Sequence, residues 1–425
     1  MTKKILLIFL LTILIFSAAV QAEKEIEFWT INLSPRFDDY FIKKIEEFEN
    51  KNPEIKINWE DINFSSINQQ LRYRIAEGNI PEVVNLSPQL MASLLEEELL
   101  FPISTLDKDF SQYYYSLFWE NGYYKGGYYA FPWYVSSKLM AFNQEIFKIA
   151  GVNPQNIPKN QEEFFKLAEQ ITAETGVYAL MPQIKIQHEF IEAGIKLFKN
   201  EDQRNKAAFN TEKAEAVINR YQNLAEKGVI PKDTLSSGFN IALERYKKND
   251  LAILLTAPQF LKEIENESDY LRDVTALSII PAAEEGVINA ALMNLVIPKG
   301  ASYKNEAAEF AHFITSAEAQ AEFSEKASVL SSAVISEQEN NIEKEEIITG
   351  TVSRKALEAE AQKILQAQLS RNKDLTLIHP QADRLIRVMD EQFARAFAGK
   401  ISARDALNIM EEKWNQILAE EKNND

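Results

Sequence analysis

The side chains in this chain that could recognise a ligand are mostly neutral amides and hydroxyls. Asn32 follows the first expected strand, and Asn85, Ser87 and Gln89 follow the third. In open α/β sheets, ligands bind beyond the carboxyl ends of the strands, and neither tip has a glycine-rich phosphate loop. Gln381 precedes an expected helix and could cap it or reach the same ligand. We therefore expect hydrogen bonding to a polar solute.

Two tryptophans could provide a flat apolar surface on which a ring-shaped solute stacks. Trp29 lies at the tip of the first expected strand, and Trp133 follows Pro132. Aromatic side chains of this size also dominate protein cores. The sequence leaves both interpretations open, a platform for the solute and packing inside the protein.

Catalytic arrangements are poorly represented. The three histidines, His188, His312 and His379, are far apart and show no HExxH-like spacing, so we expect no zinc site. Neither a GxSxG nucleophile turn nor a GxGxxG or P-loop motif occurs. We expect no metal, no cofactor and no enzymatic activity. An exported glycan hydrolase stays open as an alternative, because it needs only two carboxylates and the chain has 63 Asp and Glu.

Residues 1–22 have the three-part pattern of a secretory signal peptide. Lys3 and Lys4 precede an apolar run at residues 5–16, and small residues lead up to Ala22. The run is too short to span a membrane. There is no cysteine, so neither a disulfide nor the lipid attachment of a lipoprotein can form. We expect cleavage near Ala22 and a soluble protein in a periplasm.

Length and charge narrow the class of partner. About 400 residues would remain after cleavage, which is more than one core usually supports, so two domains are expected. The formal net charge is −17, and loss of Lys3 and Lys4 makes it −19. Such a charge disfavours nucleic acid and anionic lipid as partners. We expect a monomer that binds a small molecule.

The first part of the chain alternates between strand and helix patterns. Residues 25–29, 55–59 and 83–84 have strand character, and apolar residues recur at helical spacing over 37–48 and 67–75. The resulting β-α-β-α-β order indicates an open, largely parallel sheet with right-handed crossovers.

The rest of the chain is mainly helical in pattern. Apolar residues recur at helical spacing over residues 162–172, 211–226, 307–314, 385–397 and 403–418. Residues 251–256 and 276–280 are apolar runs of strand length. Thr315 and Glu318 have the spacing of a capping box, and the charged segment 337–346 indicates a loop or an exposed helix end.

Six segments of the chain resemble segments of one known family and occur in the same order. They are residues 41–57, 71–84, 124–151, 246–260, 295–320 and 398–407. The third is similar to a "Y.GK.YGVP……L.YN.DLF..AG" pattern and is the strongest match. Together they resemble the family 1 extracellular solute-binding proteins of ABC importers, the group that includes maltose-binding protein. The resemblance implies an α/β protein of two lobes, each an open, mostly parallel sheet flanked by helices, joined by a multi-strand hinge.

The resemblance also implies that each lobe is discontinuous in sequence. Crossings between the lobes would fall near residues 131–137, 277–281 and 329–336. The N-terminal lobe would hold residues 23–131 and 282–328. The C-terminal lobe would hold residues 132–281 and 329–425, including the hinge crossings.

Further site residues follow from the resemblance alone. Ser136, Gln183, Gln259 and Asn294 lie in segments that line the ligand cleft in the family. The family's GPW motif reads APQ here, so a tryptophan that often stacks on sugar is missing, and Phe260 follows one residue later. The implied function is capture of a sugar or oligosaccharide by hinge closure and delivery to membrane permease subunits. A non-sugar solute such as a polyol remains an alternative.

Overall fold

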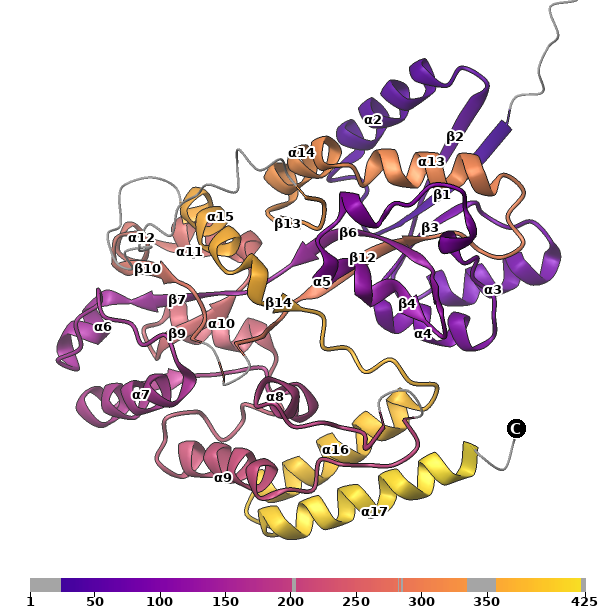
Figure 1. Ribbon diagram of the computed structural model, residues 1–425. Coiled ribbons are helices and arrows are strands. Elements are labelled where there is room, and N and C mark those ends of the chain that lie inside the picture. Colours follow the sequence, from indigo (N-terminus) through magenta and orange to yellow (C-terminus); the bar gives the residue numbers. More distant parts are fainter. Residues whose placement is uncertain (1–23, 201–203, 282, 284–285, 335–356, 422–425) are drawn as a thin grey trace, which may run out of the picture.

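The structure is a computed structural model that describes residues 24–200, 204–281, 283, 286–334 and 357–421. Two α/β lobes lie side by side, and strands near the middle of the molecule pass between them (Figure 1). The expected signal peptide at residues 1–22 and the charged segment 337–346 lie outside the described residues.

The first lobe is built on a six-stranded sheet in the order β13-β6-β12-β3-β1-β2. Its strands are β1 (Lys24–Ile31), β2 (Ile55–Ile62), β3 (Val83–Leu86), β6 (Ala130–Ser136), β12 (Ala291–Val296) and β13 (Leu330–Ser331). Its helices are α2 (Asp38–Lys51), α3 (Ile67–Glu77), α4 (Pro88–Glu96), α5 (Ser116–Trp119), α13 (Lys304–Ile314) and α14 (Ala317–Ala327). Smaller elements are η1 (Ile103–Thr105), η2 (Ser111–Tyr113), η3 (Glu120–Gly122) and the hairpin strands β4 (Tyr123–Tyr124) and β5 (Gly127–Tyr128). The β-α-β-α-β start expected from the sequence is confirmed.

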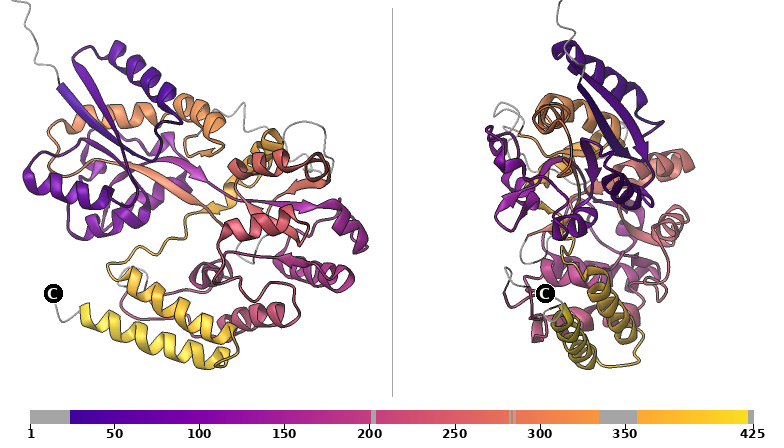
Figure 2. Two further views of the ribbon diagram at one scale, coloured as in Figure 1. Left: turned by 180° about the vertical axis from the view of Figure 1, so that it is seen from behind. Right: turned by 90° about the vertical axis from the view of Figure 1, so that its right-hand side faces the viewer.

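The second lobe is built on a four-stranded sheet in the order β10-β7-β9-β8. Its strands are β7 (Leu139–Asn143), β8 (Tyr178–Leu180), β9 (Leu251–Thr256) and β10 (Thr275–Ser278), and a separate pair is formed by β11 (Ile288–Asn289) and β14 (Asn372–Lys373). The helices before β10 are α6 (Gln144–Ile149), α7 (Gln161–Thr175), α8 (Ile186–Glu192), α9 (Glu212–Glu226), α10 (Phe239–Lys247), η4 (Pro258–Phe260), α11 (Leu261–Glu267) and α12 (Asp269–Val274). The last are α15 (Leu357–Ala367), η5 (Leu369–Arg371), α16 (Ala382–Phe397) and α17 (Ala403–Glu421). Figure 2 shows α16 and α17 side by side at the far end of this lobe.

Both large sheets are mixed, which corrects the expectation of mostly parallel sheets. β1 pairs in parallel with β2 and β3, but β12 runs antiparallel to both β3 and β6. In the second lobe β7 is antiparallel to β9 and β10, and only β8 pairs in parallel with β9. The reason is the route of the chain. β1 and β3 end at the side of the sheet that faces the second lobe, whereas β12 begins at that side because the chain has just returned from the second lobe.

The expected boundary between residues 131 and 132 divides a single strand. All of β6 belongs to the first sheet, where it pairs with β12 and β13. The expected boundary before residue 329 would assign β13 to the second lobe, although β13 lies in the sheet of the first lobe. We propose instead that the chain leaves the first lobe after Ser136 and after the β13 segment, and that it returns just before β12.

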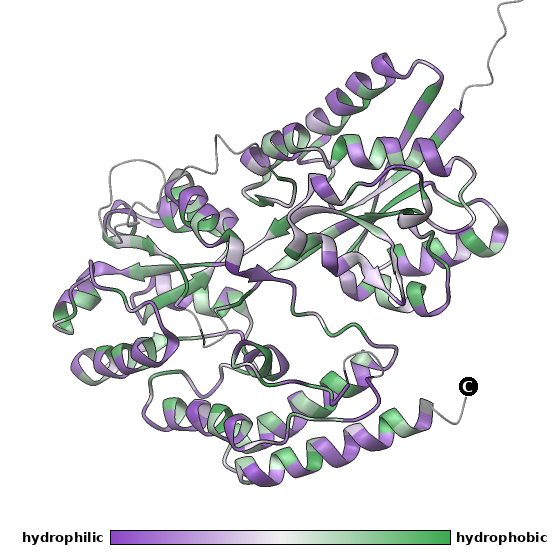
Figure 3. Ribbon diagram, in the orientation of Figure 1, coloured by the Kyte–Doolittle hydropathy of each residue, from purple (hydrophilic) through white to green (hydrophobic). Residues whose placement is uncertain are grey.

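Hydrophobic clusters account for the stability of each lobe by itself. One packs α7, α9, α16 and α17 around the second sheet, and another packs α2, α13 and α14 on one face of the first sheet. A further cluster lies at the crossings and combines Phe118 and Val135 with Leu277 and Ile364. Figure 3 shows helices with alternating purple and green stripes, as expected where one face packs on a core. In the described part of the chain no helix combines the length and apolar character needed to cross a membrane.

One local expectation was wrong by a single residue. The cap of α14 is Ser316, whose hydroxyl accepts a hydrogen bond from the Ala319 N–H. Thr315 is fully buried, and its hydroxyl donates to the Ala311 carbonyl of α13 instead. The capping-box spacing pointed to Thr315 because Glu318 follows three residues later, whereas Ser316 caps the helix without such a partner.

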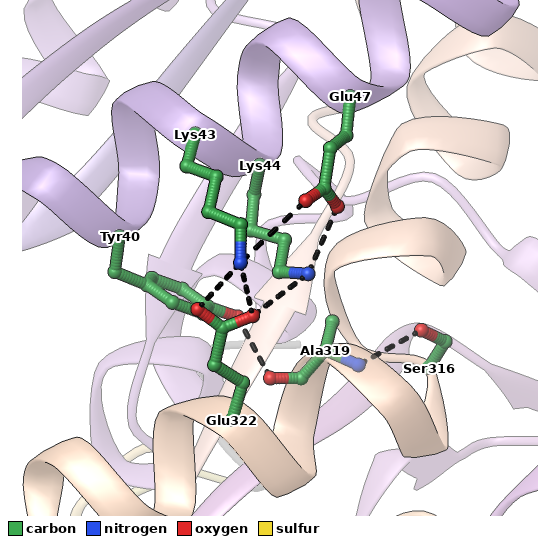
Figure 4. A network of polar contacts seen from close by, with 7 residues as sticks. All are labelled: Tyr40, Lys43, Lys44, Glu47, Ser316, Ala319 and Glu322. Carbon is green, nitrogen blue, oxygen red and sulfur yellow. Dashed lines mark hydrogen bonds and ion pairs between the residues drawn. The ribbon is translucent and has the colours of Figure 1, made fainter.

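A polar network fastens α14 onto α2 in the first lobe (Figure 4). Lys44 is almost fully buried, and its ammonium lies 2.9 Å from a Glu47 carboxylate oxygen and 3.0 Å from one of Glu322. Burial acts to lower the pKa of Lys44, but the two carboxylates outweigh it and the pKa is raised. Nearby, the Tyr40 hydroxyl donates to the Ala319 carbonyl at 2.9 Å.

We expect Glu322→Gln to lower the free energy of unfolding by about 1.5–3 kcal/mol at pH 7, because it removes a charged hydrogen-bond partner from a buried ammonium. The lysine bonds hold the pKa of Glu322 below its usual range despite burial. The contribution of Glu322 to stability is therefore present above the pKa that its carboxyl group has in the unfolded state, and it is lost as the pH falls through the pKa of the folded state. Urea unfolding at pH 7 and in acid measures both effects.

Glu325→Gln is the matched control, since Glu325 lies exposed on the same helix. Equal unfolding curves for the two variants at pH 7 would contradict the importance of the buried ammonium.

Candidate binding site

Two hollows in the surface are lined by residues of both lobes. The first, which we call the tyrosine pocket, has a volume of about 610 Å³ and sets Tyr123 of the first lobe opposite residues 194–198 and 373–378. The second, the glutamine pocket, has about 550 Å³ and sets Gln89 of α4 opposite α8 and α16. Thr376 and Leu377 line both pockets. The two are therefore adjoining parts of one groove, the inter-lobe cleft.

A smaller hollow of about 130 Å³, the hinge pocket, lies where the chain crosses between the lobes. Lys138 of the first crossing and Asn289 of the second line it, together with Glu189 and Glu192 of α8. The hinge pocket shares Lys185 and His188 with the glutamine pocket and Val287 with the tyrosine pocket. All three hollows thus adjoin one another.

Neither expected tryptophan faces this cleft. Trp29 is 1% exposed, and its indole N–H donates to a Glu27 carboxylate oxygen at 2.7 Å. Trp133 is 0% exposed and stacks on Phe323 with ring centroids 5.5 Å apart. Both rings are packed in the first lobe, so the platform interpretation of Trp29 and Trp133 is corrected to core packing. Strand alternation gives the period of a strand's faces but not what covers each face.

Two of the expected amides do line the hollows. Gln89 is exposed in the glutamine pocket, and Gln183 is exposed at the hinge pocket. Gln89 occupies the second position of α4, just beyond the carboxyl end of β3. Its placement follows from the rule that ligands approach sheets at that edge.

Asn85 and Asn294 are fully buried side chains of neighbouring strands. The Asn85 amide donates to the Asn294 carbonyl at 3.1 Å, while the Asn294 amide has no hydrogen-bond partner among the described residues. Because neither is exposed, the expectation that they contact a solute directly is corrected. Asn85 was expected at a strand tip and Asn294 from the resemblance alone, and neither argument could show that both side chains are buried within the sheet.

Three more expected residues hold local structure. Ser87 caps α4 by accepting from the Leu90 N–H at 3.3 Å. Asn32 is exposed with a φ of 51°, and its side-chain oxygen accepts from the Phe64 N–H at 3.3 Å. Gln381 precedes α16, where its N–H donates to the His379 ring at 3.0 Å.

The remaining three are partly accessible but line none of the three hollows. Ser136 is half-buried at the end of β6, paired with Ala291. Gln259 is exposed on η4. Phe260 is half-buried against Phe239, with ring centroids 4.6 Å apart, so packing accounts for its position.

Sequence reasoning missed the residues that give the cleft its character. Tyr123 is 52% exposed and packs edge-on against Tyr128, with centroids 5.3 Å apart. On α8, Gln187 is almost fully buried beside the glutamine pocket, and its side-chain oxygen has no partner among the described residues. A tract of four tyrosines around two glycines, residues 123–129, was the available signal. It marks a tight hairpin, but not the direction of each ring.

Charged groups at the hinge pocket strongly affect one another. Burial raises the pKa of Glu192 to about 8, and the nearby Glu189 carboxylate adds to the rise. The Asn289 N–H, which donates to Glu192 at 3.3 Å, and the charges of Lys138 and Arg371 oppose it. Burial raises the pKa of Glu189 as well, so the pair holds a proton to higher pH than an exposed carboxyl group would. The Glu192 carboxyl group contacts β11, which lies in the segment by which the chain returns to the first lobe.

His188 lies between the hinge and glutamine pockets. Burial lowers its pKa to about 4, and the charges of Lys185 and Lys138 act in the same direction. The imidazole is thus neutral near pH 7 and offers one donor and one acceptor. Among the described residues, no group of three or more His, Asp or Glu side chains is placed to hold a metal ion.

Comparisons with known proteins agree on one family and one fold. Residues 34–321 match the family described as bacterial extracellular solute-binding protein. A crystal structure described as a candidate oligosaccharide periplasmic-binding protein from Synechococcus sp. MITs9220 is 26% identical, with a TM-score of 0.78, and covers 93% of this chain and 99% of that one. The sugar-binding protein MalE from Xanthomonas citri has a TM-score of 0.76 at 19% identity, covering 94% and 98%. The arabinooligosaccharide-binding protein of Bacillus subtilis is 24% identical over 169 residues, 38% of this chain and 37% of that protein. The expected two-lobe periplasmic-binding-protein fold is confirmed.

As the pH rises from 5 to 8, we expect the free energy of unfolding of the wild type to fall by about 1 kcal/mol or more compared with that of Glu192→Gln. A folded pKa of about 8 means that the native state holds a proton that the unfolded state has released, so stability falls across this window. Urea unfolding at several pH values measures the difference. Glu174→Gln, at an exposed position of α7, is the control, and parallel pH curves for wild type and Glu192→Gln would rule out the raised pKa.

Proposed function

Because the chain belongs to the family of bacterial extracellular solute-binding proteins, we propose that it captures a sugar or oligosaccharide in the inter-lobe cleft and delivers it to the permease subunits of an ABC importer. Members of this family serve such importers by binding a small solute. They are not enzymes, so the glycan-hydrolase alternative is set aside. Release into a periplasm after cleavage near Ala22 remains part of the proposal.

The proposal rests on the observation that both lobes contribute walls to the cleft. Tyr123 and Gln89 come from the first lobe, whereas residues 373–378, α8 and α16 come from the second. A solute that fills either pocket would touch both lobes at once. Only a ligand with different contacts in the open and closed forms can shift the equilibrium between them. Walls from two bodies provide that difference, which supports closure about the crossings.

The chemistry of the walls supports a polyhydroxylated solute. Gln89 offers an exposed planar amide with donors and an acceptor, and His188 is a neutral imidazole. The exposed ring of Tyr123 offers an apolar face with a polar edge. Sugar hydroxyls can form hydrogen bonds with the amide and the imidazole, and the C–H face of a sugar ring can pack on the tyrosine ring. Relatives named for oligosaccharides support the same class, while a polyol would use the amide without the ring.

We expect the purified mature chain to bind one saccharide molecule and to become more compact. Thermal-shift screening against sugars, oligosaccharides and polyols identifies the solute, and calorimetry gives the stoichiometry. Small-angle scattering with and without it measures the radius of gyration. Binding without any decrease in that radius would contradict closure, and turnover of the saccharide would contradict a pure binding role.

Tyr123→Ala should weaken saccharide binding about twofold to tenfold, since aromatic contacts of this kind contribute about 0.5–1.5 kcal/mol. Folding should be little affected, because the side chain is 52% exposed. Calorimetric titration measures the affinity. Tyr73→Ala is the matched control, as Tyr73 is 64% exposed on α3 and lines none of the three hollows. Equal affinities for both variants would remove Tyr123 from the site.

A further inference from the structure

The tyrosine pocket carries an excess of positive charge in a protein that is strongly acidic overall. Its walls include three basic residues, Lys196, Arg204 and Lys373, and two acidic residues, Glu120 and Asp374. The chain as a whole has 63 Asp and Glu against 46 Lys and Arg. The local balance is therefore the reverse of the global one.

The two acidic residues of this pocket already have partners. Asp374 accepts from the Leu292 N–H and the Thr376 N–H, both at 2.9 Å, so both of its oxygens are engaged. Glu120 accepts from the Tyr128 hydroxyl at 2.9 Å. These bonds direct the carboxylate oxygens toward neutral donors, and within the described residues neither carboxylate forms an ion pair with a lysine of this pocket.

Two of the basic groups have no such partner. Lys196 and Lys373 are exposed, and neither forms an ion pair or hydrogen bond with its ammonium within the described part of the chain. Arg204 differs, because its guanidinium donates to the Ile378 carbonyl. The bond fixes the arginine in the pocket wall. A closing cleft would bring these charges against whatever lies within it.

The adjoining glutamine pocket has the opposite balance. Asp383, Asp390 and Glu391 outnumber Lys185 and Arg387, and Lys185 lies 3.8 Å from Asp390. An anionic group would be repelled from that end of the cleft and attracted to the other. The charge pattern thus favours a single orientation for a solute that is acidic at one end.

We propose, on the basis of the function proposed above, that the solute is an acidic saccharide whose carboxylate or ester sulfate sits in the tyrosine pocket against Lys196 and Lys373. Its sugar ring packs on Tyr123, and its neutral hydroxyls reach toward Gln89. Charge-assisted hydrogen bonds are about twice as strong as neutral ones, and desolvation on closure strengthens them further.

The test compares acidic saccharides with neutral ones of equal length on the mature chain. The probes are trigalacturonate and galactotriose, together with a sulfated disaccharide and its unsulfated parent, which separate the two sources of charge. We expect the acidic member of at least one pair to bind about tenfold more tightly at low ionic strength, and the advantage to shrink in high salt.

The matched variants are Lys196→Met/Lys373→Met in the pocket and Lys232→Met/Lys413→Met at exposed positions outside the three hollows. Both pairs change the net charge equally. The pocket variant should lose about tenfold in affinity for the acidic probe, keep its weak affinity for the neutral one and unfold as wild type does. The control should bind as wild type does.

The outcomes separate this inference from the function on which it rests. A neutral probe that binds as tightly as its acidic partner, with compaction of the protein, overturns the acidic solute and leaves sugar capture standing. An acidic probe that binds both variants equally overturns the assignment of Lys196 and Lys373. Failure of every probe, charged or neutral, to bind or to compact the protein overturns both proposals.

Discussion

The whole molecule depends on the way in which three passages of one chain connect two separately packed bodies. Each lobe buries its own hydrophobic cluster, and a further cluster with Phe118, Val135, Leu277 and Ile364 fills the space at the crossings. The lobes therefore do not need the cleft closed in order to remain folded. Under the proposed function, a ligand that contacts both lobes would add the contacts that distinguish the closed form from the open one.

Polar groups at the crossings are arranged differently from those in the cleft. Arg371 donates to the Ile280 carbonyl at 2.8 Å and the Gly286 carbonyl at 3.1 Å, Ser137 donates to Asn372 at 2.6 Å, and Glu192 accepts from Asn289. These bonds satisfy buried groups where the chain changes lobe, as buried polar groups require. In the cleft, by contrast, Gln89, Gln187 and two lysines have no partner among the described residues. The difference separates the polar groups that hold the lobes together from those that remain available to the proposed solute.

Local periodicity was enough to place most elements, but not to identify the cleft. The strands at residues 55–62 and 251–256, and the helices α7, α9, α13, α16 and α17, follow directly from the spacing of apolar residues. Gln89 could be placed beside the cleft because it lies just beyond the carboxyl end of a strand. Trp29 and Trp133 were misjudged because side-chain direction along a strand says nothing of the helices that cover that face. Tyr123 and Lys373 were missed because the groove is formed by segments about 250 residues apart, which no local pattern relates.

The position of β12 in the first sheet also bears on how the protein is made. This strand lies between β6 and β3, near the middle of the sheet, yet it comprises residues 291–296. A nascent chain cannot finish the first lobe until well over half of its length has left the ribosome, although the lobe begins at the amino terminus. Domains usually fold in order as they are synthesised. Here the amino-terminal lobe can be completed only after β12 has been synthesised, so the order of folding cannot simply follow the order of synthesis.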